Sequence, residues 1–71
     1  MANSIFLGRL NAEQRKALIE RLWQAQGGKC FITGKDIDLS LHEGELDIDH
    51  VIPLTNGGKD DESNFALTFS S

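Results

Sequence analysis

An aspartate and a histidine stand next to each other at Asp49 and His50, and together they offer two functions that hydrolysis requires. Imidazole has an ordinary pKa of about 6.5, so a neutral histidine can take a proton from a water molecule as a general base. A carboxylate oxygen is the kind of ligand that Mg²⁺ prefers. The pair could therefore activate a water molecule beside a bound divalent cation.

The segment from Leu46 to Leu54, L-D-I-D-H-V-I-P-L, predicts how this pair is positioned. Its first five residues alternate, with two aspartates between apolar residues and the histidine, which is typical of a half-buried strand. Pro53 has no amide hydrogen to donate, so the strand should end before it. His50 would then lie at the strand end, where a loop gives it room to meet a ligand. The alternative is a surface carboxylate beside a histidine that caps a hydrophobic patch.

The residues after this segment extend the pattern. A Gly-Gly loop occupies residues 55–58, a polar run occupies residues 59–63, and Asn64 is followed by apolar residues. This order of elements resembles the HNH endonuclease family, whose members carry D-H-x-x-P-L, a Gly-Gly loop and an asparagine before an apolar run. The resemblance covers Gly27 to about Leu67, and the ordered set is more specific than any one of its parts.

The resemblance implies a role for each of three residues: His50 as the general base, Asp49 as the metal ligand, and Asn64 as the residue that holds the loop so that the histidine points correctly. It implies a nuclease that hydrolyses phosphodiester bonds in double-stranded DNA with Mg²⁺ or Mn²⁺. The family also places a His, Asn or Asp on a helix after the second strand, where it completes the metal site. Since the sequence stops at Ser71, we expect part of a longer nuclease, weakly active or inactive until a missing C-terminal segment completes it.

The charge distribution leaves a second function class open. The net charge is −4, which is unfavourable for a free-standing DNA-binding protein. Residues 1–35 hold six basic residues against two acidic ones, and residues 36–71 hold one lysine against nine acidic residues. The first half could contact a nucleic-acid backbone and the second could hold a cation, or the pattern is ordinary surface charge. The alternative function is a non-catalytic nuclease fragment that binds nucleic acid or a protein partner through its basic helix.

Cys30 is the only cysteine, so a disulfide within the chain is excluded. Many HNH relatives carry Cys-x-x-Cys at this point, as half of a structural zinc site. Here Thr33 takes the second position, and a hydroxyl is a poor zinc ligand beside thiolate and imidazole. We therefore expect no structural zinc, with Cys30 as a small buried hydrophobic residue.

The length allows one small α+β domain, an N-terminal helix packed on a short antiparallel β-hairpin. By the resemblance, this is the ββ part of a ββα-metal motif that lacks its last helix. Residues 1–10 are predicted to form a loosely held arm or an edge segment. Residues 11–71 are predicted to form the nuclease domain, with a helix at 11–26 and the ββ region at 29–71. Asn11 and Gln14 predict a capping box, and the glycines at 27 and 28 predict the helix end.

The other expected elements follow from local patterns. Trp23 lies on the apolar stripe of the helix and should be part of the core. We expect a strand at 29–33, an amphipathic extended segment at 37–41, a turn at 42–45, a solvated loop crest at 60–62 and a strand at 65–69 that pairs with 47–50. An exposed hairpin edge would make self-association plausible. The sequence shows no membrane span and no secretory signal, which predicts a cytoplasmic protein with no membrane partner.

Overall fold

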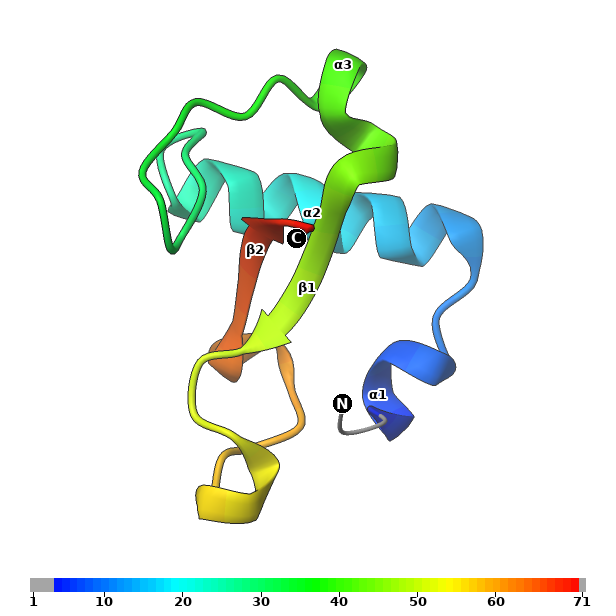
Figure 1. The fold of residues 1–71 in the computed structure, drawn as a ribbon. Coiled ribbons are helices and arrows are strands. Elements are labelled where there is room, and N and C mark those ends of the chain that lie inside the picture. Colours follow the sequence, from blue (N-terminus) through cyan, green and yellow to red (C-terminus); the bar gives the residue numbers. More distant parts are fainter. Residues whose placement is uncertain (1–3, 71) are drawn as a thin grey trace.

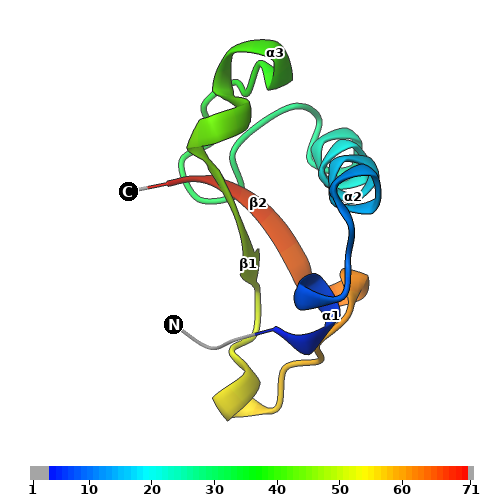
Figure 2. The same ribbon diagram turned by 90° about the vertical axis from the view of Figure 1, so that its right-hand side faces the viewer.

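A two-stranded antiparallel sheet crossed by one long helix forms the centre of the molecule (Figure 1). The computed structural model describes residues 4–70. Strand β1 (Leu46–His50) pairs with β2 (Phe65–Phe69), with Leu46 opposite Phe69 and His50 opposite Phe65. Helix α2 (Ala12–Ala25) covers one face of the sheet, as the turned view shows (Figure 2). The expected α+β class, with this strand pairing, is confirmed.

Shorter elements surround this centre. They are the helices α1 (Ile5–Gly8) and α3 (Leu39–His42) and the 3₁₀ turns η1 (Glu43–Glu45), η2 (Leu54–Asn56) and η3 (Glu62–Asn64). No helix follows β2 within residues 4–70, and no helix among those residues is both long enough and apolar enough to cross a bilayer.

Helix α2 begins and ends where its sequence predicts. The Asn11 side chain accepts from the Gln14 amide at 2.8 Å, and the Gln14 side chain accepts from the Asn11 amide at 2.9 Å, which completes the capping box. Gly27 and Gly28 both have positive φ, as the turn after the helix requires. The chain can therefore reverse direction tightly at residue 28.

The core lies between α2 and β2. Its buried residues come from α2 (Leu18, Leu22), from β2 (Phe65, Leu67) and from the intervening segment (Cys30, Ile37). Trp23 packs at the margin of this core, and its indole nitrogen donates to the carbonyl of Ile37 at 2.8 Å. The expectation that Cys30 is part of the core is confirmed, whereas Trp23 is half-buried and packs against the core.

The outer edge of β2 is covered by side-chain hydrogen bonds at its middle residue. The Gln26 side chain donates to the Leu67 carbonyl at 2.9 Å and accepts from the Leu67 amide at 2.7 Å. The Phe31 amide also donates to the Leu67 carbonyl. A second chain cannot pair with β2 at this position without displacing these groups.

Two local expectations are wrong. Residues 29–33 do not form a strand: Lys29 makes one isolated bridge with Asp36, and the chain between them is a tight turn in which Gly34 donates to the Cys30 carbonyl. The segment at 37–41 is not extended either. Asp38 caps the amide of Ser40 at 2.9 Å and starts α3, so local capping overrides the alternating pattern.

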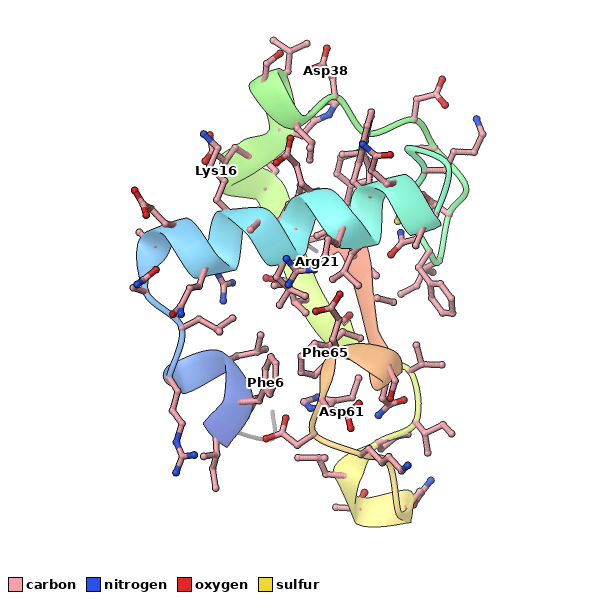
Figure 3. The ribbon with its side chains drawn as sticks, turned by 180° about the vertical axis from the view of Figure 1, so that it is seen from behind. Phe6, Lys16, Arg21, Asp38, Asp61 and Phe65 are labelled. Atoms are coloured by element: carbon pink, nitrogen blue, oxygen red, sulfur yellow. The ribbon has the colours of Figure 1, made fainter. Side chains whose placement is uncertain are left out.

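The arm expected at residues 1–10 also differs. Its first three residues lie outside the described part of the chain. The next ones form α1, which Ser4 caps through the Leu7 amide, and Phe6 meets the ring of Phe65 edge to face at 5.4 Å (Figure 3). The segment from Ser4 onward is therefore packed against the core and is not a loose arm.

Trp23 provides a test of this packing. We expect Trp23→Ala to lower the free energy of unfolding by roughly 2–4 kcal/mol, because it removes a large half-buried side chain. Trp23→Phe keeps a ring but loses the bond to the Ile37 carbonyl, and should cost about 1–2 kcal/mol. Urea denaturation followed by circular dichroism measures both. An unchanged midpoint for Trp23→Ala would contradict the placement of this residue.

Candidate active site

Strand β1 brings Asp49 and His50 to one cleft at its C-terminal end. The alternation is as expected, with Asp47 and Asp49 exposed and Ile48 and His50 half-buried. The cleft has a volume of about 560 Å³ and is lined by residues from α1, α2, β1 and the loop after β1 (Ser4, Leu7, Arg15, Asp47, Ile48, Asp49, His50, Pro53, Leu54, Thr55). The structure therefore places the two residues on the walls of one cleft.

His50 is held on two sides. Its Nε2 lies 2.9 Å from Oδ1 of Asp60, and its ring meets the ring of Phe65 edge to face at 5.1 Å. The side chain is only 12% exposed. Such contacts fix the plane of the imidazole, which a general base requires.

Asp60 is a residue of the site that the sequence did not predict. The loop crest expected at 60–62 is not simply solvated, because Asp60 accepts from the hydroxyl of Ser4 at 2.5 Å and the amide of Phe6 at 3.1 Å, besides its contact with His50. These hydrogen bonds, from Ser4 first and then from His50 and Phe6, lower the pKa of Asp60 to about 2. Since the donors lie 54 to 56 residues away and at the end of another strand, no local pattern could have indicated them.

Asn64 ties the two ends of the loop between the strands. Its side chain is buried; Oδ1 accepts from the Ile52 amide at 2.9 Å, and Nδ2 donates to the carbonyls of Ile52 at 2.8 Å and Lys59 at 2.9 Å. Asn64 is not among the residues that line the cleft. Its amide therefore fixes the loop that leaves the sheet at His50.

Gly58 is required by the same contact. A Cβ atom at this position would lie 1.8 Å from the Ile52 carbonyl oxygen and 2.9 Å from Nδ2 of Asn64. The second glycine of the Gly-Gly pair is therefore needed because the backbone of Ile52 passes too close for any side chain.

The comparison with known families agrees with this geometry. A family model described as HNH endonuclease matches residues 29–71, more than half of the chain. The chain belongs to the HNH endonuclease family. The CRISPR-associated endonuclease Cas9 1 of Streptococcus thermophilus (strain ATCC BAA-491 / LMD-9) is similar, with 35% identity over 54 residues. That match covers 72% of this chain and 5% of the relative, so the chain spans a small part of the length of that protein.

The oxygen donors of this HNH cleft fit a hydrated divalent cation. Oδ2 of Asp49 accepts weakly from Thr68 Oγ1 at 3.2 Å, and Asp47 lines the same cleft two residues earlier. Among residues 4–70 there is no group of three or more His, Cys, Asp or Glu side chains arranged for a metal. One or two carboxylates suit Mg²⁺, which keeps several waters, and do not suit a structural zinc ion.

His42 lies outside the site. Its Nδ1 accepts from the Asp38 amide at 3.0 Å, and its ring meets Phe69 edge to face at 5.0 Å. This histidine therefore has a local structural role at the end of α3.

The contact at Gly58 can be tested by adding one methyl group. We expect Gly58→Ala to lower the free energy of unfolding by about 1–3 kcal/mol, because the backbone of Ile52 must move. Gly44→Ala is the matched control, since a Cβ atom there would meet nothing within 4 Å and the φ of Gly44 is not positive. It should change stability by less than about 0.5 kcal/mol. Equal effects of the two substitutions in urea denaturation would contradict the close approach.

The low pKa of Asp60 predicts a dependence of stability on acid. Its pKa in the folded protein, about 2, is below the ordinary 3.8, so folding favours the ionised form. The stabilisation is complete above 3.8 and is lost as the pH falls toward 2. The urea midpoints of the unchanged protein and of Asp60→Asn should therefore differ most near neutral pH and converge in acid. A difference that stays constant over this range would argue against the hydrogen bonds at Asp60.

Proposed function

We propose that this HNH chain carries the catalytic part of a nuclease that hydrolyses phosphodiester bonds in double-stranded DNA with Mg²⁺ or Mn²⁺. The observation that supports this most is the placement of Asp49 and His50 on one cleft at the end of β1. Asn64 supports it further, because its buried amide holds the loop that follows His50.

The chemistry divides between the residues of the cleft. His50 takes a proton from the attacking water, and its contact with Phe65 keeps the ring in place. Asp49 would hold the divalent cation, which when bound shields the charge on the phosphate and assists the departing oxygen. Asn64 acts through the loop by keeping Ile52, and with it the strand end, in position.

Arg15 is the basic residue of the cleft that could contact DNA. It lines the cleft from the first turn of α2 and makes no ion pair within residues 4–70. Arg21, by contrast, is committed to Glu62 through two hydrogen bonds of 2.9 Å (Figure 3). We infer that Arg15 contacts a backbone phosphate of the bound duplex.

The nuclease function is tested by nicking of supercoiled plasmid, in which a single cut per molecule is visible. With Mn²⁺ or Mg²⁺ we expect slow nicking that EDTA stops and that His50→Ala lowers by about 10²–10⁴-fold. His42→Ala is the matched control, since it removes the other histidine, and should leave the rate within about twofold when the protein is folded. Equal nicking rates in the His50 variant would contradict the role of His50, and no nicking with either metal would contradict a catalytic function of this chain by itself.

The role of Arg15 is tested by duplex binding in EDTA, where no cutting occurs. We expect Arg15→Ala to weaken binding of a short duplex and to reduce the slope of log K against log salt concentration by about 1, as loss of one phosphate contact does. Lys16→Ala is the control with the same charge change. Lys16 lies on the side of α2 that faces α3, beside Leu39 and Glu43 (Figure 3). Identical affinities and slopes for the two variants would rule out a specific contact at Arg15.

A further inference from the structure

We propose that Asp60 is a positioning residue that keeps the proton of neutral His50 on Nε2, so that Nδ1 is the ring nitrogen that accepts the proton of the attacking water. This inference rests on the proposed function, because it specifies how the general base of that site is prepared. Asp60 itself does not touch the substrate; it acts through the imidazole.

Both oxygens of the Asp60 carboxylate are occupied by hydrogen bonds. Oδ1 receives the Ser4 hydroxyl at 2.5 Å and lies 2.9 Å from Nε2 of His50, while Oδ2 receives the Phe6 amide at 3.1 Å. Ser4 and Phe6 belong to the start of α1, so both carboxylate oxygens are fixed by a folded element. An ionised carboxylate has no hydrogen to donate. The contact between Asp60 and His50 is therefore a hydrogen bond donated by Nε2.

The other ring nitrogen of His50, Nδ1, is free to accept a proton. A neutral imidazole carries one proton, so a proton on Nε2 leaves a lone pair on Nδ1. Nδ1 has no hydrogen-bond partner within residues 4–70, and no buried side-chain nitrogen or oxygen in that range lacks a partner. Nδ1 is therefore accessible to water, and His50 lines the cleft. The ring of Phe65, whose centroid lies 5.1 Å from that of the imidazole, restricts the rotation that would move Nε2 away from Asp60.

The proton balance is complete with these groups. One O–H bond of the attacking water breaks as its proton moves to Nδ1, and the oxygen forms a bond to phosphorus. The bond between phosphorus and the departing oxygen breaks, and that oxygen takes a proton from solvent water. The imidazolium formed at His50 lies beside the Asp60 carboxylate, which stabilises its positive charge until Nδ1 returns the proton to solvent. The net reaction is hydrolysis of one phosphodiester by one water.

The tautomer can be measured directly, without any activity. In nitrogen-15 NMR of the full chain at a pH where His50 is neutral, we expect Nε2 to resonate as a protonated nitrogen and Nδ1 as an unprotonated one. In Asp60→Ala the two ring resonances should move toward an averaged mixture of tautomers. If Asp60→Ala does not fold, Asp60→Asn is used. Its amide places an N–H₂ group among the donors of Ser4, Phe6 and His50, and should also shift the mixture of His50 tautomers.

Two results would overturn the proposal. One is a His50 of the unchanged protein that carries its proton on Nδ1. The other is a folded Asp60 variant whose ring resonances equal those of the unchanged protein. Because the measurement needs only the folded chain, a failed nicking assay would count against the proposed function without affecting this result.

Kinetics provide the second measurement where nicking is observed. We expect Asp60→Ala to lower kcat at least about tenfold, a part of the 10²–10⁴-fold that a positioned base contributes, and to leave KM within about twofold. Asp61→Ala is the control in the same loop. Asp61 accepts from the amide and hydroxyl of Ser63 and makes no hydrogen bond to His50. An equal loss of kcat in both variants would indicate a general effect on the loop and would contradict a specific role for Asp60.

Discussion

The paired hydrogen bonds between the Asn64 amide and the backbone of Ile52 are the constraint on which the site depends. A loop of fourteen residues joins β1 to β2, and without a cross-link near the sheet its conformational freedom would extend to the strand ends. Asn64 closes this loop by satisfying both the amide and the carbonyl of Ile52. His50 lies at the end of β1, just before the closed loop, so this contact limits the freedom of the backbone that follows it.

Side chains also bind distant backbone groups elsewhere in the molecule. Such bonds matter because a chain of 71 residues can bury only a small apolar core. Gln26 binds both backbone groups of Leu67, and Trp23 binds the carbonyl of Ile37. Each bond joins a side chain near the end of α2 to backbone far along the chain. Buried polar groups satisfied in this way fix one arrangement of the elements, which apolar contacts alone specify less sharply.

The sequence predicts those parts of the fold whose signals are local. The alternation at Leu46–His50 and the capping box at Asn11 each involve residues within a few positions of one another, and both are present. The order of the motif elements also predicted that Asp49, His50 and Asn64 lie near one another. The turn at residues 29–36 and helix α3 were predicted wrongly, because short alternating runs fit both a strand and a turn or capped helix. The contacts of Asp60 could not be predicted, since Ser4 and Phe6 approach it only after the whole chain has folded.

Helix α1 shows that the boundaries of the family match and of the working unit are different. The match begins at residue 29, yet Ser4, Phe6 and Arg15, which contact Asp60 or line the cleft, all precede it. A fragment trimmed to the matched region would keep every residue of the motif and lose the contacts that α1 makes with Asp60. Inactivity of such a fragment would therefore say little about the motif itself.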